Sequence, residues 1–172
     1  MSNILSQNFF NRPTLVVAKE LLGKYLVRKI GAKEVVLMIT KVEAYDGYKD
    51  KASHASRGKT ERNQVMFGPA GYFYIYFTYG MHWMLNIVTG PKNYPAAVLI
   101  RGTKEINGPA RLTKFLKIDK KFNGKKAELK TGLWFEDRGV KINPKDIMKT
   151  ARVGVAYAGP VWSKKKYRFL LK

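Results

Sequence analysis

One acidic residue stands out by its position, because the chain contains only 12 Asp and Glu residues. The segment KVEAY places Glu43 and Tyr45 at the end of an apolar stretch, directly before a long polar segment. Alternation with period two predicts that Glu43 shares a face with Val35, Leu37 and Ile39. A carboxylate that is partly removed from water works well as a general base. A structural glutamate paired with a lysine or arginine would give the same pattern, and the pattern alone favours that second interpretation.

Two further polar residues could take part in chemistry. His54 lies in ASHASRGKTERN, a segment of small and basic residues, where it could contact a substrate or carry a proton. A loop histidine that bonds only to nearby backbone is the more common situation. Arg101 ends the apolar stretch AVLIR, and its guanidinium could bind a phosphate or a carboxylate. The segment SRGKTER lacks the spacing of a phosphate-binding P-loop and does not predict one.

Aromatic residues are concentrated in GYFYIYFTYGMHW, residues 71–83. Alternation with period two divides this segment into two faces. One face is apolar, contains Phe73, Ile75 and Phe77, and is expected in the core. The opposite face contains Tyr72, Tyr74, Tyr76 and Thr78. For any single aromatic, a place in the core or on a half-buried sheet is the more common situation. A tyrosine-rich face in a basic protein nevertheless suits stacking on nucleobases.

The charge of the chain is strongly unbalanced. It has 33 Lys and Arg residues and a formal net charge of +21. Such an excess favours a polyanionic partner, either nucleic acid or an anionic membrane surface, and of these we favour nucleic acid. A general adaptation for solubility is the alternative.

Several classes of protein are disfavoured by composition. The absence of cysteine excludes disulfides and thiolate metal sites, and with only two histidines we expect no metal site. Residues 63–91 carry no full charge, but their prolines, glycines and period-two alternation argue against a membrane-spanning helix. The first residues lack the pattern of a secretory signal, so we expect a cytoplasmic protein.

The candidate residues must be positioned by strands and a few helices. We expect helices over 11–23 and 108–118, with Pro13 and Pro109 in their first turns, and a one-turn helix after Asn143-Pro144. The expected strands cover 24–30, 34–45, 71–78, 82–90, 96–102, 133–135, 152–157 and 167–171. Residues 46–70 form a long loop, a length that in compact domains usually indicates function. Without regular βαβ alternation, this pattern predicts an α+β fold around a mainly antiparallel sheet, as one domain over 1–172.

The order and content of the motifs are more specific than any one of them. They are KVEAY, SHASRGKTERN, MFGPAGYFYIYFTYGMHWMLNIVTG, AVLIRG, GPARL and RVGVAYAG. Together they resemble the alkyladenine (3-methyladenine) DNA glycosylase family, over about residues 12–171 and most strongly over 42–102. The resemblance implies a single compact α+β domain with a curved antiparallel sheet, in a bacterial-type member.

The family resemblance also implies an activity. Its members are monofunctional enzymes that need no cofactor, flip damaged purines out of duplex DNA and hydrolyse the N-glycosidic bond in base excision repair. The implied bases are 3-methyladenine, 7-methylguanine, hypoxanthine and ethenoadenine. The implied partner is double-stranded DNA that contains such a base. The resemblance further implies a monomer that does not bind membranes and that acts in the cytoplasm, or at the nucleoid if the protein is bacterial.

The resemblance assigns roles to individual residues. Glu43 matches the catalytic base that activates water, Arg101 matches the arginine that positions water and nucleotide, and the backbone carbonyl of Val153 matches a further water contact. The base-binding residues are Tyr45, His54 and Tyr76 as walls, and Asn86 as the residue that crowds the amino group of guanine. The DNA-binding residues are Tyr79, which enters the duplex, with Met81, Arg57 and Arg62. Tyr72 and Tyr74 then remain on the sheet surface.

Three positions depart from the family pattern, and two other activities compete with the one it implies. KTERN and GPAG each lack an expected proline, and Pro160 stands where we expect an acidic residue. These positions concern loop geometry more than the reaction.

A noncatalytic nucleic-acid-binding module would use the same tyrosines and basic residues. A bifunctional glycosylase-lyase would instead use a lysine as a Schiff-base nucleophile.

Overall fold

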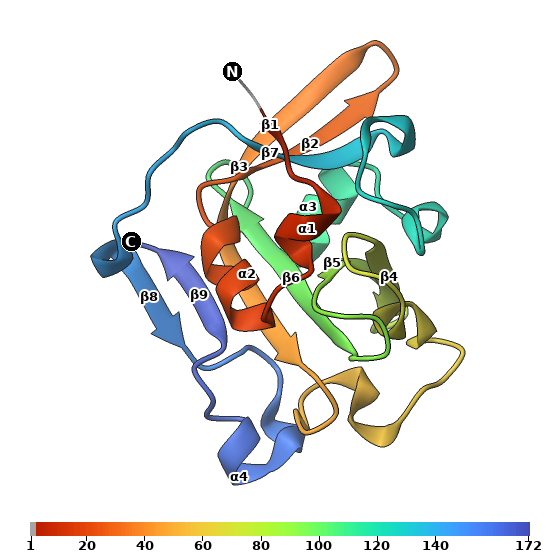
Figure 1. The fold of residues 1–172 in the computed structure, drawn as a ribbon, viewed down its shortest axis with the longest axis vertical. Helices are drawn as coiled ribbons and strands as arrows, with labels where there is room; N and C mark the ends of the chain where they lie inside the picture. Colours follow the sequence, from red (N-terminus) through yellow and green to blue (C-terminus); the bar gives the residue numbers. More distant parts are fainter. Residues whose placement is uncertain (1–2) are drawn as a thin grey trace.

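The computed structural model describes residues 3–172, and their centre is an antiparallel sheet (Figure 1). Its strands are β1 (Asn3–Ile4), β2 (Tyr25–Ile30), β3 (Lys33–Asp46), β4 (Phe73–Thr78), β5 (His82–Val88), β6 (Ala96–Thr103), β7 (Leu133–Asp137), β8 (Ile147–Thr150) and β9 (Arg168–Leu171). Their order is β1-β7-β2-β3-β6-β5-β4, and β9 pairs with both β3 and β8. The long strand β3 therefore joins the two halves of the sheet, and the predicted α+β fold with a mainly antiparallel sheet is confirmed.

Short helices surround the sheet. The α-helices are α1 (Gln7–Phe10), α2 (Thr14–Leu21), α3 (Pro109–Phe115) and α4 (Gly159–Trp162). The 3-10 helices are η1 (His54–Arg57), η2 (Gln64–Phe67), η3 (Lys120–Phe122), η4 (Leu129–Thr131), η5 (Pro144–Asp146) and η6 (Ala156–Ala158). None of the helices within residues 3–172 has the length and apolar character needed to cross a membrane.

The first predicted helix is shorter than expected. It begins after Pro13 and ends at Leu21, so the segment 11–23 is only partly helical. Gly23 follows with a φ of 80°, and a Cβ added to it would lie 2.7 Å from Cγ1 of Ile142. The backbone conformation and the close approach both require glycine at this position.

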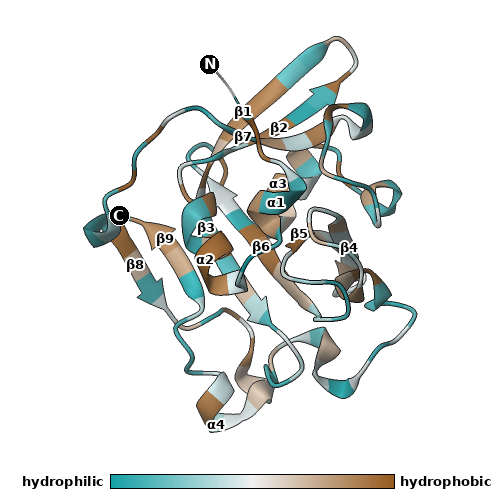
Figure 2. Cartoon of the chain, viewed as in Figure 1, coloured by the Kyte–Doolittle hydropathy of each residue, from teal (hydrophilic) through white to brown (hydrophobic). Residues whose placement is uncertain are grey.

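The two faces of the sheet have different surroundings. Helix α2 contacts β3 and β6, helix α3 contacts β5 and β6, and both contribute to the largest hydrophobic cluster. Representative members of this cluster are Val17, Ile39, Phe73, Ile100 and Leu112. Hydrophobic residues concentrate in the central strands, whereas the long connecting segments are largely hydrophilic (Figure 2). Helices α2 and α3 thus cover one face, and loops with short helices cover the other.

Strand β3 changes the face on which its side chains lie. Strict alternation predicted that Ile39 and Glu43 share a face, but Ile39, Val42 and Ala44 all belong to the same core cluster. The pairing of β3 with β6 is irregular between Ile39 and Val42. That prediction is therefore wrong, because the irregularity turns Glu43 away from the core and toward the loop-covered face.

Strand β4 departs from its predicted pattern at both ends. Phe73 is buried as expected, but Phe77 is 42% exposed and packs on Trp83, with ring centroids 4.6 Å apart, near the tip of the β4–β5 hairpin. Tyr74 is not on the sheet surface as predicted, since it is only 1% exposed. The loop 46–70 folds over it and contributes Ala55, Met66 and Phe67 to a second hydrophobic cluster. The core ends before the tip of the hairpin, which the alternation of residues could not indicate.

The C-terminal part contains both confirmed and wrong predictions. The one-turn helix after Asn143 is confirmed as η5, where the Asn143 side chain accepts a hydrogen bond from the Lys145 N–H. The predicted strand over 152–157 is wrong, because Arg152 turns inward and Gly154 has a φ of 72° before η6 begins. Strands β1 and β8 were not predicted.

The core boundary along β4 can be tested with two matched substitutions. We expect Phe73→Ala to lower the free energy of unfolding by about 3–5 kcal/mol, because it leaves a cavity in the main core. We expect Phe77→Ala to lower it by only about 1 kcal/mol, since the lost contact is one exposed aromatic pair. Urea denaturation measures both values, and equal losses would contradict this description of the core.

Candidate active site

A cavity of about 240 Å³ lies on the face of the sheet opposite the main core. Its lining residues from the sheet are Tyr45, Tyr74, Tyr76, Thr78, Met84, Asn86, Ala97, Leu99 and Arg101. The remaining lining residues are Ala52, Ser53, His54, Met66, Tyr79, Pro109, Val153, Gly154, Val155 and Tyr157. Pockets for drug-sized ligands usually measure about 300–1,000 Å³. This cavity is smaller and suits a single flat ring system.

Glu43 is completely buried behind the cavity wall. Its Oε1 accepts a hydrogen bond from the backbone N–H of Val153 at 2.8 Å, and its Oε2 accepts one from the Tyr45 hydroxyl at 2.9 Å. Nη1 of Arg101 lies 3.6 Å from the same Oε2. A buried carboxylate without such partners would be strongly destabilising. These contacts therefore hold the carboxylate in a fixed place beside the cavity.

Val153 contacts Glu43 through a different atom from the one named by the family resemblance. The structure places its backbone N–H, not its carbonyl, against the carboxylate. The carbonyl's role in binding water stays a prediction.

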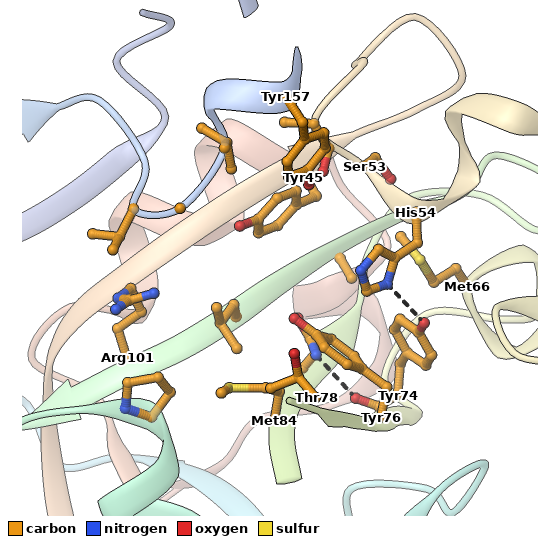
Figure 3. Close-up of a pocket in the computed structure, with 18 of the residues that line it drawn as sticks. Tyr45, Ser53, His54, Met66, Tyr74, Tyr76, Thr78, Met84, Arg101 and Tyr157 are labelled. Carbon is orange, nitrogen blue, oxygen red and sulfur yellow. Dashed lines mark hydrogen bonds between the residues drawn. The ribbon is translucent and has the colours of Figure 1, made fainter. Parts of the chain in front are cut away.

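Aromatic rings form two opposite walls of the cavity (Figure 3). Tyr45 lies on one side, and Tyr76 lies on the other with Tyr74 next to it, at a distance of 5.4 Å between ring centroids. Burial, and then the charge of Glu43, raise the pKa of Tyr45 well above its usual value. Burial raises the pKa of Tyr74 to about 12 and also raises that of Tyr76. All three phenols are consequently neutral at physiological pH.

His54 stands at the mouth of the cavity, exposed at its opening and packed against both neighbouring tyrosines. Its ring lies 4.6 Å from that of Tyr76 in an edge-to-face arrangement, and its Nδ1 lies 3.1 Å from the Tyr74 hydroxyl. Burial, and then the positive charge of Arg62, lower the pKa of His54. The ring is therefore neutral at pH 7. The direction of the hydrogen bond between Nδ1 and the Tyr74 hydroxyl depends on the tautomer of His54; in the tautomer with an N–H on Nε2, the Tyr74 hydroxyl donates to Nδ1.

The remaining predicted site residues occupy three different places. Asn86 is buried in the cavity wall, and its side-chain amide donates to the backbone carbonyl of Tyr74 at 3.2 Å. Tyr79 borders the cavity at the β4–β5 turn, with a φ of 52° and 81% of its surface exposed. Met81 is exposed in the same turn but does not line the cavity. The structure thus gathers most of the predicted residues around one cavity, and their roles stay predictions.

Arg57 and Arg62 lie outside this cavity, in an adjacent groove. Arg62 donates a hydrogen bond to the backbone carbonyl of Phe77 at 2.8 Å, and its guanidinium lies 5.4 Å from the centre of the Tyr76 ring. It therefore supports the cavity wall from the groove side.

Nothing in this neighbourhood is arranged as a metal site. Within residues 3–172 no group of three or more His, Cys, Asp or Glu side chains could hold a metal ion. The buried acids Glu43 and Asp50 each contact an arginine.

Comparison with known proteins identifies the kind of molecule that carries this cavity. A family model described as "Methylpurine-DNA glycosylase (MPG)" matches residues 8–106 and 102–172. The chain belongs to the methylpurine-DNA glycosylase family. The family predicted from the motifs is thereby confirmed, and the chain is a DNA glycosylase, an enzyme of DNA repair whose substrate is DNA.

Relatives with similar sequences extend over nearly the whole glycosylase. Each carries the name "Putative 3-methyladenine DNA glycosylase". The relative from Methanocella arvoryzae is 42% identical, over 91% of this chain and 86% of its own length. Those from Legionella pneumophila and Borreliella burgdorferi are 41% and 40% identical, each over 98% of this chain and 94% and 96% of their own lengths.

A buried ion pair supports the glycosylase site and was not predicted from the sequence. Arg152 binds both carboxylate oxygens of Asp50, at 2.5 and 2.8 Å, and neither side chain is exposed. The same guanidinium donates to the backbone carbonyl of Ala44 and lies 4.8 Å from the centre of the Tyr45 ring. It thereby ties the loop after β3 and the segment with Val153 to the end of β3. The two partners are 102 residues apart, and no local pattern connects them.

The ion pair can be tested against an exposed one. We expect Arg152→Met to lower the free energy of unfolding by about 3–5 kcal/mol, because it leaves Asp50 buried without a partner. Arg12→Met, which breaks an exposed pair with Glu20, should lower it by about 0–1 kcal/mol. A small effect of Arg152→Met in urea denaturation would show that the pair does not hold these segments together.

The low pKa of His54 predicts a dependence of stability on pH. As the pH falls, the unfolded chain binds this proton near pH 6.5, before the folded glycosylase does, so protonation favours unfolding. The contribution of neutral His54 to the free energy of unfolding is therefore complete above about pH 6.5. It is lost as the pH falls through the pKa that His54 has in the folded protein. His54→Gln should flatten the dependence of unfolding free energy on pH in this window.

Nuclear magnetic resonance gives a direct measurement of the same group. The imidazole signal that disappears in His54→Gln should titrate below about pH 6.5, and Arg62→Gln should raise its midpoint. A midpoint at or above the usual value would contradict a neutral His54 at the cavity mouth.

Proposed function

We propose that this glycosylase removes damaged purines from duplex DNA after the nucleotide has been flipped into the cavity. The proposed bases are 3-methyladenine, 7-methylguanine, hypoxanthine and ethenoadenine. The observation that carries the proposal is the fully buried Glu43, held at the edge of an aromatic cavity sized for one ring system. We also propose that the protein acts as a monomer, as the family resemblance implies.

Glu43 would serve as the general base of the hydrolysis. A water oxygen attacks C1′ of the deoxyribose, its proton passes to the carboxylate, and the electron pair of the C1′–N bond leaves with the base. Each carboxylate oxygen has two lone pairs, so the hydrogen bonds from Tyr45 and Val153 leave acceptor sites for this water. The negative charge also stabilises positive charge that develops on the sugar. Arg101 lies near enough to orient the water and the nucleotide.

The aromatic walls suit a flipped purine. Tyr45 and Tyr76 are neutral phenols on opposite sides of the cavity, so a flat base can stack between them. Purines alkylated on a ring nitrogen are cationic, and electron-rich rings attract them. In the tautomer with an N–H on Nε2, His54 can donate to an acceptor on the base edge, and Asn86 would exclude the amino group of normal guanine.

Tyr79 would occupy the space that the flipped base leaves in the duplex. It projects from a tight turn, keeps 81% of its surface exposed and borders the cavity. A wedge of this kind offsets part of the free energy lost when the base is unstacked.

Substitution of Glu43, the proposed general base, gives the decisive test of the function. We expect Glu43→Gln to reduce excision of hypoxanthine and ethenoadenine from duplex oligonucleotides by about 100- to 10,000-fold, while lesion binding is retained. Strand cleavage by alkali after the reaction measures excision, and gel shift measures binding. Glu34→Gln, an exposed change in the same strand, should excise at the rate of the unmodified protein.

Two results would contradict this function. One is the absence of base release from both lesions and from methylated DNA, which would leave only a nucleic-acid-binding module. The other is an unchanged excision rate in Glu43→Gln. Trapping of a covalent protein–DNA adduct by borohydride would point instead to a lysine nucleophile.

A further inference from the structure

Each aromatic wall of the cavity has an arginine behind it. The guanidinium of Arg152 lies 4.8 Å from the centre of the Tyr45 ring, and that of Arg62 lies 5.4 Å from the centre of the Tyr76 ring. Tyr45 and Tyr76 lie on opposite sides of the cavity (Figure 3), and neither arginine is among the residues that line it. A base stacked between the two tyrosines would therefore have a guanidinium beyond each ring.

The charges of the arginines around the cavity are not equivalent. Arg152 binds both carboxylate oxygens of Asp50, so its charge is largely balanced inside the protein. Arg101, which lines the cavity, lies 3.6 Å from the Glu43 carboxylate. Within residues 3–172, Arg62 forms no ion pair with Asp or Glu. Of these three arginines, Arg62 is thus the one whose charge no acid offsets.

Arg62 is held in a fixed place beside Tyr76. Its guanidinium donates a hydrogen bond at 2.8 Å to the backbone carbonyl of Phe77, the next residue on β4. Its charge also acts at the cavity mouth, where burial, and then Arg62, lower the pKa of His54. A base in the cavity would lie on the other side of the same tyrosine ring, within reach of the same positive potential.

We propose that Arg62 determines the selectivity of the cavity between cationic and neutral bases. A cation on one face of an aromatic ring makes the other face less attractive to a second cation, because like charges repel. Tyr76 backed by Arg62 is consequently a weaker platform for ring-alkylated, cationic purines than a tyrosine alone. Neutral damaged purines such as hypoxanthine and ethenoadenine lose no affinity in this way. The proposal rests on the proposed function, since it concerns the base that is flipped into the cavity.

Two duplexes that contain bases of the same shape but different charge test this selectivity. One contains 3-methyladenine, which is cationic as a nucleotide, and the other contains 3-methyl-3-deazaadenine, which is uncharged. A 2′-fluoroarabino sugar at both nucleotides prevents cleavage, so fluorescence anisotropy measures binding alone. At about pH 8 His54 is neutral both with and without Arg62, and its protonation does not enter the comparison.

We expect Arg62→Gln to raise the affinity for the cationic duplex relative to the neutral one by about two- to fivefold. Higher salt should reduce this effect, because ions screen an exposed charge. Arg62→Lys, which keeps the charge, should change the ratio much less. Arg57→Gln removes a charge from the same groove, but within residues 3–172 Arg57 forms no cation–π contact, so it should leave the ratio unchanged.

The ratio of the two affinities separates this role from other roles of Arg62. A phosphate contact, or a merely structural support of the Tyr76 wall, would affect both duplexes equally and would cancel. Arg62 is exposed, so its variants should fold, and circular dichroism verifies this.

The outcomes also separate the role of Arg62 from the proposed function. An unchanged ratio in Arg62→Gln, or an equal change in Arg57→Gln, would overturn the proposal. The proposed function would stand in that case if both modified duplexes bind more tightly than an undamaged one. Failure of both to do so would disprove the proposed function and this inference with it.

Discussion

The burial of the Glu43 carboxylate is the constraint on which the site depends. An ionised group inside a protein costs several kcal/mol unless polar partners surround it. One partner, Tyr45, lies two residues away on β3, and the others come from distant parts of the chain: Arg101 on β6 and the backbone of Val153 in the C-terminal segment. The Arg152–Asp50 pair fixes that last segment and packs under the Tyr45 ring. The site therefore forms only when the sheet, the loop after β3 and the C-terminal segment are assembled.

The sheet separates stability from chemistry. One face, with helices α2 and α3, holds the main core, while the other holds the cavity beneath two loops. Strand β3 contributes to both faces, because the irregularity in its pairing turns Glu43 away from the core and toward the cavity without ending the strand. A side chain on a well-paired central strand is held more precisely than one on a loop, which suits the general-base role that we propose for Glu43.

Much of this architecture could be predicted from the sequence, and the failures have physical causes. Alternating residues indicated the strands, and the combination of motifs indicated the family, which was confirmed. The face of Glu43 was predicted wrongly, because an irregularity in strand pairing has no local sequence signal. The burial of Tyr74 depends on a loop that folds over it, and the Arg152–Asp50 pair joins residues distant in the chain. The periodicity of the sequence does not indicate such tertiary contacts. It also does not indicate that the core ends before Phe77.

The central claim is that one buried carboxylate, held by these contacts, activates water beside a stacked, flipped purine. It is tested most directly by a crystal structure of Glu43→Gln bound to duplex DNA that contains ethenoadenine. The account predicts the lesion base between Tyr45 and Tyr76, with a water within about 3 Å of the side chain at position 43 and close to C1′. A lesion that stays stacked in the duplex, or a C1′ atom out of reach of that side chain, would contradict it.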